Sequence, residues 1–357
     1  MKILIISNMY PSIKDPVYGT FVESFVKQMI DMNGYKSTKI LVIKGRTNNI
    51  FIKFWKYFAF YLRIIINLLC YKFDLIYVHT ITYPIPPIRI VNKFKYLPLV
   101  FNVHGGDVLT RSRVADMLKK QAIPLLKKSK LIISPSNYFK DILLSEFSFL
   151  TSDKIFVSPS GGIDSSFFFV NKLKPSSLFT IGYVSRIDNK KGWDTFIEAI
   201  SILKSKGYVI YAYMAGRGNQ TKDLVNMINN KSLNEYIEYI GPVPYNELPL
   251  LYSKLDLFVF PTQLKESLGL VGLEAMAKRV PVVGSHIGGL TDYLISGHNG
   301  FFFEAGNSKD LANKIEKYLL LSSDEKDIFR NNAFATACQY SSEKVKKDLY
   351  LKLKSII

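Results

Sequence analysis

The sequence predicts an α/β protein made of two parallel-sheet domains of similar size. Strand-like and helix-like patterns alternate along the chain, which favours a parallel sheet with helices on both faces. The alternation restarts after a polar, proline-containing segment at 171–177, the predicted linker. The length of 357 residues also exceeds one ordinary domain. We therefore expect a first domain at 1–170, a second at 178–341 and a final helix at 342–357.

In the first half, strands and helices follow one another closely. Helical spacing of apolar residues begins at Gly19 and Thr20, and a long apolar helix is expected at Phe51–Tyr71. A basic helix at Arg111–Lys128 contains Pro124, which we expect to bend or split it. The expected strands are Lys2–Ser7, Lys39–Ile43, Asp74–His79, Leu97–Val103, Leu131–Ser134 and Lys154–Val157, and a further helix starts at Ser136.

The second half repeats this pattern. The expected strands are Leu178–Ser185, Val209–Ala215, Tyr236–Ile240, Leu255–Phe260, Val280–Gly284 and Phe301–Phe303, and the expected helices include Trp193–Leu203, Lys309–Leu321, Asp324–Gln339 and Ser342–Ile357. In open parallel sheets, ligands bind outside the carboxyl ends of the strands. Polar residues that directly follow a strand are therefore the candidate site residues.

The composition favours some partners and locations over others. The formal charge is +18, and residues 1–170 carry most of the excess, with 23 Lys and Arg against 10 Asp and Glu. Such a surface favours nucleic acid, anionic lipid or an acidic substrate. Two cysteines are too few for a disulfide framework. Neither a signal peptide nor an apolar run of roughly 18 residues is present, so we expect a cytoplasmic protein.

The segment from Glu266 to Glu274 is the centre of the candidate site, because it opens a short helix after a buried strand. Eight helical residues rise about 12 Å, whereas the two carboxylates of a glycosidase lie roughly 5 to 9.5 Å apart. The pair is therefore a poor acid/base couple and suits two anchors for one long ligand. Amides of Gly269, Leu270 and Val271 would seat a phosphate between them, as in a nucleotide-sugar. The alternative is a capped helix with an ordinary surface glutamate.

Two cations follow the first strand of the second half. Arg186 stands at the end of the strand, and Lys191 comes just before Gly192 and a helix. A helix N-terminus is unfavourable for cations unless an anion joins them. Arginine supplies a bidentate fork and lysine a point charge. We interpret the two as a diphosphate clamp; a surface pair near a helix start is the alternative.

Several segments carry a family resemblance together: Arg186–Gly192, Ala215–Gly218, Gly241–Pro244, Asp256–Pro261, Glu266–Met276, Pro281–Val283, Gly288–Gly289 and Asn299–Gly300. In order and spacing they resemble glycosyltransferase family 4, over roughly residues 178–305. The first half matches more loosely, through Gly19–Thr20, His104–Asp107 and Ser160–Asp164. The resemblance implies a retaining, nucleotide-sugar-dependent enzyme of GT-B fold, with two Rossmann-like domains facing each other across a cleft. In that fold the last helix packs back toward the first domain.

The resemblance also implies roles on the donor side. In the family, the glutamate that corresponds to Glu266 contacts hydroxyls of the donor sugar, and the glutamate that corresponds to Glu274 holds the ribose hydroxyls. The positions of Arg186 and Lys191 bind the diphosphate, and the amides at Leu270 and Val271 reach its distal phosphate. The donor-side positions, besides Glu274, are those of Gly216, Val243, Ser267, Gly269, Leu270 and Val271, together with Gly19 and Thr20 of the first domain.

On the acceptor side, the resemblance places His104 near the donor sugar and the acceptor, with Asp107 beside the acceptor. For His104 the alternative is a histidine satisfied by local backbone, and for Gly19 it is plain helix capping. We expect His79 to be structural. Thr20 stands where the family frequently has a second glycine, a departure that we expect to bear on the acceptor contacts.

The implied mechanism needs no metal. No Asp-x-Asp segment or cluster with metal-ligand spacing stands out in the sequence, and Arg186, Lys191 and the helix start could stabilise the departing diphosphate. The acceptor hydroxyl would attack the face that the nucleotide leaves, and a donor phosphate oxygen would take its proton. Two alternatives stay open: a nucleotide-sugar epimerase of the same fold, and a basic nucleic-acid-binding protein, which no recognised binding motif supports.

The basic first half also suggests a membrane surface. The apolar helix Phe51–Tyr71 and a cluster of lysines (Lys119, Lys120, Lys127, Lys128 and Lys130) would suit peripheral contact with anionic lipid at the inner face of the cell membrane. A lipid-linked acceptor, which is frequent in the family, would fit this location. The alternative is a buried helix together with a solvated basic face.

Overall fold

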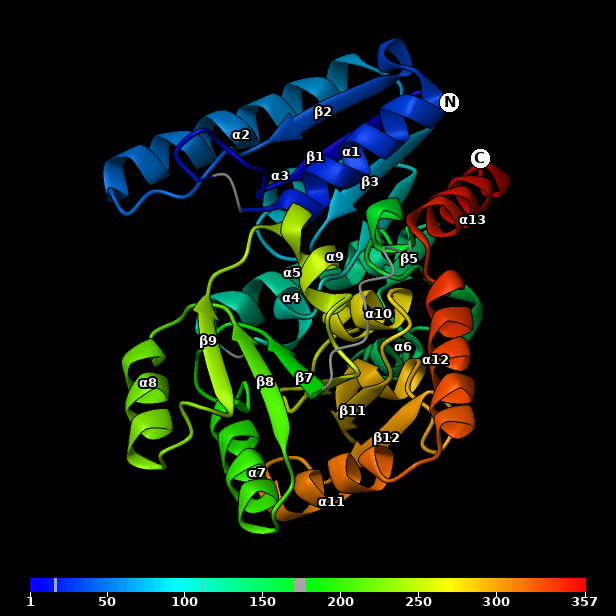
Figure 1. Ribbon diagram of the computed structural model, residues 1–357. Coiled ribbons are helices and arrows are strands. Elements are labelled where there is room, and N and C mark those ends of the chain that lie inside the picture. Colours follow the sequence, from blue (N-terminus) through cyan, green and yellow to red (C-terminus); the bar gives the residue numbers. More distant parts are fainter. Residues whose placement is uncertain (16–17, 111, 170–177) are drawn as a thin grey trace. The chain divides into compact units, whose positions relative to one another are not determined.

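The computed structural model describes residues 1–15, 18–110, 112–169 and 178–357, and these form two compact units (Figure 1). Unit 1 comprises Met1–Gly161 and Val345–Ile357, and unit 2 comprises Gly162–Lys344. The boundary falls before the predicted linker at 171–177, which lies outside the described residues. Ile163 belongs to unit 2 because its backbone exchanges hydrogen bonds with Tyr340 and Ser342.

Unit 1 is built on a parallel sheet in the order β2-β1-β3-β4-β5-β6. The strands are β1 (Ile3–Ser7), β2 (Thr38–Val42), β3 (Leu75–His79), β4 (Leu99–Asn102), β5 (Leu131–Ser134) and β6 (Ile155–Val157). The helices are α1 (Thr20–Asn33), α2 (Ile50–Cys70), α3 (Ile85–Asn92), α4 (Gly106–Leu109), α5 (Arg113–Lys128), α6 (Asn137–Glu146) and, from Val345, α13 (Ser342–Ser355).

Strand β1 shows how this sheet is covered on both faces. Successive side chains of a strand point to opposite faces. Ile3 and Ile5 therefore pack with α1 and with Leu353 of α13, whereas Leu4 and Ile6 lie in the core that α2, α3 and α5 complete. The buried apolar run of β1 is what a parallel strand covered on both faces requires.

Two helices of unit 1 differ from the expectation. Helix α3 was not predicted, because its Pro86 and Pro87 look like helix breakers, yet proline is tolerated in the first turn, where no amide partner is needed. Helix α5 runs through Pro124 from Arg113 to Lys128, so of the expected bend or split, the split is wrong. Both Pro124 and Lys120 are exposed, so the carbonyl that loses its amide partner can bond to water.

Unit 2 has the same architecture, with a parallel sheet in the order β12-β11-β10-β7-β8-β9. The strands are β7 (Phe179–Val184), β8 (Ile210–Ala215), β9 (Ile237–Gly241), β10 (Leu257–Phe260), β11 (Val282–Ser285) and β12 (Gly300–Phe303). The helices are α7 (Trp193–Ser205), α8 (Thr221–Asn230), α9 (Leu248–Tyr252), α10 (Leu270–Ala277), α11 (Ser308–Leu319) and α12 (Ser323–Cys338). Helices α7, α8 and α11 cover one face, and α9, α10 and α12 the other.

Each sheet reverses its winding once. In unit 1 the chain adds β2 on one side of β1 and β3 on the other, and in unit 2 it adds β8 and β9 on one side of β7 and β10 on the other. The loops that leave the two central strands diverge at such a point and open a crevice above the sheet. The carboxyl ends of β1 and β3, and of β7 and β10, are therefore where each unit can hold a ligand.

Candidate functional site

In unit 2 the reversal point brings a lysine and a glutamate together from loops far apart in the sequence. Lys191 ends the loop after β7, and Glu266 lies in the loop after β10. The Lys191 Nζ lies 2.7 Å from Glu266 Oε1, and Thr262 Oγ1 donates to the same oxygen at 3.1 Å. Both charged side chains are largely buried, at 12% and 22% exposed. The structure thus joins two of the predicted residues in one polar cluster, and adds Thr262.

Close backbone packing holds the loop of Glu266 in place. A Cβ at Gly288 would lie 2.7 Å from the backbone nitrogen of Glu266, and one at Gly289 would lie 2.5 Å from the carbonyl oxygen of Ser267. The amide of Gly289 donates to the carbonyl of Glu266 at 2.8 Å. Only glycine permits such an approach of two backbones. Gly288 and Gly289 therefore position the carboxylate from the next loop, a role that their pattern in the sequence did not reveal.

Arg186 lies apart from this cluster. Its side chain is 70% exposed and pairs with Asp188 at 2.8 Å. The other oxygen of Asp188 accepts the amide of Asn219 at 2.9 Å, which ties the loop after β7 to the loop after β8. The two cations of the predicted diphosphate clamp therefore differ in the described structure. Lys191 is largely buried, whereas Arg186 is exposed and paired with Asp188, a carboxylate that the sequence analysis missed.

The start of α10 offers amides without a side-chain cap. Gly269 is its N-cap residue in the left-handed conformation, at φ 83°, and no side chain of the described residues caps the helix there. The first amides of a helix have no partner within it, so those of Leu270 and Val271 can meet an anion. Leu270 and Val271 are half-buried, as is Ser267 in the preceding loop. This geometry suits the predicted phosphate seat.

Glu274 occupies a different environment from Glu266. It is 5% exposed within α10, and Tyr252 Oη donates to its Oε2 at 3.3 Å. Burial raises the pKa of Glu274 to about 7, which hydrogen bonds from Tyr252 and Tyr245 partly offset. The two carboxylates thus have separate partners, as the spacing argument expects of two anchors. The tyrosines were not identified from the sequence.

The remaining donor-side residues lie at the ends of β8 and β9. The amide of Gly216 donates to the carbonyl of Gly241 at 2.8 Å, and the carbonyl of Gly216 accepts Tyr239 Oη at 2.7 Å. Val243 is half-buried and packs against the core beside α9. These contacts are structural, and they leave the Gly241–Val243 backbone at the carboxyl edge of the sheet.

In unit 1 two histidines meet at the ends of β3 and β4. His79 Nδ1 lies 3.0 Å from His104 Nε2, and the two rings stack with an interplanar angle of 11°. Burial lowers the pKa of His104 to about 4 and that of His79 well below its ordinary value, so both are neutral at pH 7. The other ring nitrogen of His79, Nε2, is buried without a partner among the described residues.

Asp107 holds the backbone around His104. One of its carboxylate oxygens accepts the amide of His104 at 2.9 Å, and the other accepts the amide of Ile81 at 3.0 Å. The side chain is 8% exposed, and burial raises its pKa to about 6. Both oxygens are thus engaged with backbone, and the predicted acceptor-side carboxylate acts in this structure as a clamp between two loops.

A cavity of about 400 Å³ lies next to His104 at the reversal point of unit 1. Asn8, Phe21, Thr80 and Asp107 are among the residues that line it. Gly19 begins α1 in the left-handed conformation, and a Cβ there would lie 2.7 Å from the backbone of Met9. Thr20 is the first, exposed residue of the helix. Gly19 therefore lets the start of α1 pack closely against the loop after β1.

Within the part of the chain that the structure describes, no group of three or more His, Cys, Asp or Glu side chains is arranged so that it could hold a metal ion. The predicted independence from metal stays a prediction.

Comparison with protein families gives two adjoining matches. Residues 164–336 match the family described as glycosyl transferases group 1, and residues 28–165 match glycosyltransferase family 4. The chain belongs to the group 1, family 4 glycosyltransferases. The two family models meet at 164–165, close to the boundary between unit 1 and unit 2.

Known glycosyltransferases share part of this sequence. The chain is 30% identical over 171 residues to the capsular polysaccharide biosynthesis glycosyltransferase CapM of Staphylococcus aureus, which covers 48% of this chain and 44% of CapM. It is 32% identical over 148 residues to a D-inositol 3-phosphate glycosyltransferase of Paenarthrobacter aurescens, covering 40% and 36% respectively. The chain thus aligns with less than half the length of these curated relatives.

Solved structures establish the GT-B fold with its two Rossmann-like domains. HepE of Anabaena in complex with UDP matches with a TM-score of 0.79 at 20% identity, over 99% of this chain and all of that one. A sucrose-phosphate synthase of Thermosynechococcus elongatus matches with a TM-score of 0.76 at 16% identity, over 99% of each chain. At such identities the similarity describes the fold.

Proposed function

We propose that this chain is a retaining, metal-independent glycosyltransferase. It moves a sugar from a nucleotide-diphosphate sugar to a glycan or lipid-linked acceptor, in the synthesis of surface polysaccharide or lipopolysaccharide, at the inner face of the cell membrane. The observation that carries this proposal is the Lys191–Glu266 pair at the reversal point of unit 2, together with the uncapped start of α10. Membership of the family and the UDP bound to HepE support it.

Each group has a part in the transfer. Lys191 and the amides of Leu270 and Val271 stabilise the charge that grows on the departing diphosphate, with Arg186 turning from Asp188 to the same anion. Glu266 accepts hydrogen bonds from the sugar hydroxyls, and Glu274 from the ribose. The acceptor oxygen bonds to the anomeric carbon as the bond to the diphosphate breaks, on one face of the sugar. The acceptor proton passes to the leaving phosphate oxygen.

The decisive experiment identifies donor and product together. Calorimetric titration with a panel of nucleotide-sugars finds the donor, and NMR of the product made with that donor reports the anomeric configuration. Retention with metal chelated supports the proposal, and inversion or dependence on a divalent ion contradicts it. Loss of activity in Glu266→Ala, Lys191→Ala and Arg186→Ala, with unchanged circular dichroism, assigns the roles.

The two alternatives give different results in the same assays. A nucleotide-sugar epimerase would convert the donor with no acceptor present, which NMR of the donor alone detects. A nucleic-acid-binding protein would bind random DNA in a salt-dependent way and show no affinity for any nucleotide-sugar.

A further inference from the structure

Helix α2 is a well-capped helix with one side in the core. Asn49 accepts the amides of Phe51 and Ile52 at its start, and Lys95 donates to the carbonyls of Leu68 and Tyr71 at its end. The inward side carries Phe60, Ile64 and Leu68, which are buried in the core of unit 1. These contacts fix the position and rotation of α2 on the sheet, so the side opposite the core faces away from unit 1.

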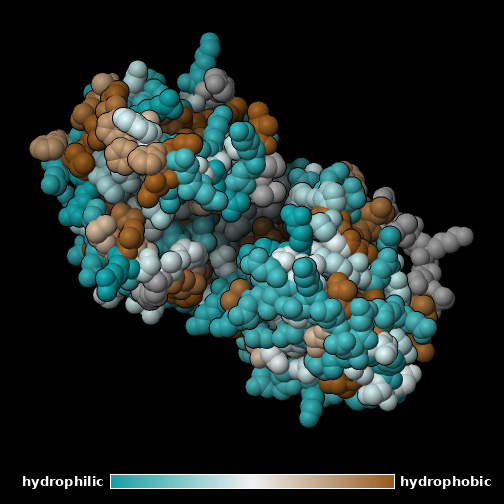
Figure 2. Space-filling view, turned by 90° about the vertical axis from the view of Figure 1, so that its left-hand side faces the viewer, coloured by the Kyte–Doolittle hydropathy of each residue, from teal (hydrophilic) through white to brown (hydrophobic). Residues whose placement is uncertain are grey.

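That opposite side is apolar and exposed. Its large side chains recur every three or four residues, which places them in one stripe along the helix. Each is between 47% and 76% exposed: Phe51, Trp55, Phe58, Leu62, Ile66 and Leu69. Figure 2 views the side on which α2 projects in Figure 1, and hydrophobic side chains gather on the upper part of that view, in unit 1. Soluble surfaces rarely carry so continuous an apolar patch without a partner.

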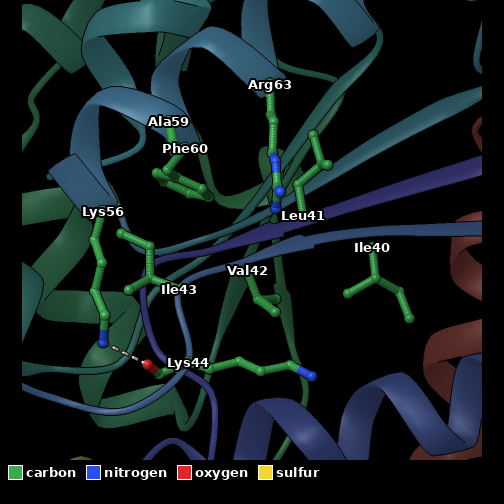
Figure 3. A pocket seen from close by; sticks show the side chains of 9 residues that line it. All are labelled: Ile40, Leu41, Val42, Ile43, Lys44, Lys56, Ala59, Phe60 and Arg63. Atoms are coloured by element: carbon green, nitrogen blue, oxygen red, sulfur yellow. Dashed lines mark hydrogen bonds between the residues drawn. The ribbon is translucent and has the colours of Figure 1, made fainter.

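The segment around the stripe is cationic. Between Asp31 and Asp74 the chain carries eight Lys and Arg and no Asp or Glu. Three of these cations line a groove of about 510 Å³ between α2 and the edge strand β2: Lys44, Lys56 and Arg63 (Figure 3). Its other walls are apolar and include Ile40, Val42 and Phe60.

The charged ends of these cations do not converge, because Arg63 extends from α2 toward β2 whereas Lys44 points away from α2 (Figure 3), with its Nζ 6.0 Å from the centre of the Tyr10 ring. Lys56 Nζ donates to the carbonyls of Lys44 and Gly45, which fixes its charge at the end of β2. Lys44 and Arg63 are exposed, and among the described residues none of the three forms an ion pair. Cations without ion-pair partners beside an exposed apolar stripe match a partner that has an anionic surface above an apolar layer.

We propose that α2 lies in the interface of an anionic lipid bilayer, with Trp55 and Phe58 among the acyl chains and with the exposed cations Lys44 and Arg63 beside the stripe each near lipid phosphates. Within the described residues no helix is long and apolar enough to cross a membrane, and an amphipathic helix of this kind lies along the surface. The inference deepens the membrane location in the proposed function, and its test measures lipid binding separately from sugar transfer.

This surface differs from the lysine cluster of the sequence analysis. Lys119 is 7% exposed, pairs with Asp116 at 2.9 Å and donates to the carbonyls of Val108 and Thr110. Lys130 donates to the carbonyl of Ile356. Those two lysines hold the fold together. Lys120 and Lys128 of the same cluster are exposed, and they supply a matched control.

A second copy of this chain suits the stripe less well than a bilayer does. Pairing two α2 stripes would place one acid-free, cation-rich segment against another, where like charges repel. Anionic lipid supplies the missing negative charge and the apolar layer together.

Flotation with vesicles tests the cations beside the stripe. The protein is expected to float with phosphatidylglycerol vesicles at low salt and to stay behind with phosphatidylcholine. Lys44→Ser with Arg63→Ser should weaken binding on the order of thirtyfold, at about fivefold per charge. The control variant, Lys120→Ser with Lys128→Ser, removes the same charge. It should weaken vesicle binding less than threefold, which corresponds to roughly half the free energy of one lipid-facing charge. Equal losses in the two pairs, or binding of inorganic phosphate at Lys44 and Arg63 without vesicle preference, would overturn the proposal.

Fluorescence tests the stripe. The chain has two tryptophans, Trp55 on the stripe and the buried Trp193. Emission should shift to the blue with anionic vesicles and be quenched by brominated lipid, and Trp55→Phe should abolish both effects. Trp55→Ser with Phe58→Ser should abolish flotation, whereas Leu320→Ser with Ile328→Ser, also exposed, should not. The stripe would instead be a contact with a second copy of the chain if sedimentation detects dimers, if Trp55→Ser with Phe58→Ser abolishes them, and if the unaltered protein does not float with vesicles.

The lipid-binding variants also separate this inference from the proposed function. Lys44→Ser with Arg63→Ser should keep wild-type turnover of the nucleotide-sugar, because neither residue belongs to the donor site. Loss of flotation with intact turnover supports the membrane surface alone. Intact flotation in a chain that turns over no nucleotide-sugar overturns the proposed function alone.

Discussion

The two reversal points of this protein have the same topology and opposite chemistry. In unit 2 the strand ends carry Lys191 and Glu266, two charges 2.7 Å apart in a partly open site. In unit 1 they carry His79 and His104, two rings 3.0 Å apart whose burial keeps both neutral. A charged pair can exchange its internal contact for a diphosphate and a hydroxyl. A neutral pair can hold a ring in place and accept or donate one hydrogen bond.

Under the proposed function, this difference divides the work between the two domains. Transition-state charge in a glycosyl transfer grows on the leaving diphosphate, so the unit that binds the donor needs fixed cations and dipoles. Under the same proposal, the unit that binds a neutral hydroxyl acceptor needs no charge to stabilise, and an uncharged histidine pair suits that role. Substitutions in each unit test this division.

Removing the charge of Lys191 should have the largest effect. Lys191→Ala takes away the largely buried cation and leaves Glu266 with Thr262 but without its ion-pair partner, so we expect kcat/KM for transfer to fall about 10²–10³-fold. Initial rates at saturating and limiting donor separate the loss of binding from the loss of turnover. Lys190→Ala is the control, because Lys190 is the exposed neighbour with the same charge. Turnover near that of the unaltered chain in Lys191→Ala would remove Lys191 from the mechanism.

Glu274 should give unit 2 a pH dependence of its own. Burial raises its pKa from 4.5 to about 7, so folding favours the protonated carboxyl. This contribution to stability is fully present below pH 4.5 and is lost as the pH rises through 7. Glu274→Gln stays neutral, so it should match the unaltered chain at pH 4.5 and be more stable by about 3 kcal/mol at pH 8. Urea unfolding at both pH values measures this.

The same substitution should weaken nucleotide binding even though it stabilises the fold. If Glu274 accepts the ribose hydroxyls as a carboxylate, Glu274→Gln should bind the nucleotide more weakly at pH 8 while unfolding at higher urea. Glu247→Gln, at an exposed glutamate, should change neither quantity. Equal stability of Glu274→Gln and the unaltered chain at pH 8 would contradict the raised pKa.

The sequence was sufficient for the parts of the fold and site that depend on strand ends. Lys191 and Glu266 each follow a buried apolar run, and parallel strands bring such positions to one edge. It was insufficient where a side chain has more than one available partner. Arg186 pairs with Asp188 two residues on, and nothing in the spacing decides between that carboxylate and a diphosphate.

Helix α2 shows the same limit for packing. Its composition indicates a long apolar helix, and the inward residues Phe60, Ile64 and Leu68 recur with the same period as the outward Phe58, Leu62 and Ile66. Periodicity therefore could not tell which side the sheet covers. The contact between His79 and His104 was missed for a related reason, since both follow strands but only the pairing of β3 with β4 makes them neighbours.

The smallest predicted effect concerns His79 as a positioning residue for His104. The two rings share one hydrogen bond, so His79 fixes which nitrogen of His104 carries the proton. His79→Leu removes that bond and should lower kcat about tenfold with little change in donor KM, because orientation and not donor affinity is lost. His79→Asn places a donor and acceptor near the position of Nδ1 and should restore most of the activity.

The pH profile distinguishes positioning from a merely structural role. Burial holds the pKa of His104 at about 4, so its protonation should not limit transfer above pH 6 in the unaltered chain. Leucine fills the space of the ring and is apolar, so His79→Leu should keep His104 buried, whereas His79→Ala leaves a void that admits water and should move the pKa of His104 up toward the ordinary value near 6.5. Transfer by His79→Ala should then fall between pH 8 and pH 6, while His79→Asn stays flat. An equal loss at every pH in His79→Ala and His79→Asn would show that His79 only supports the fold.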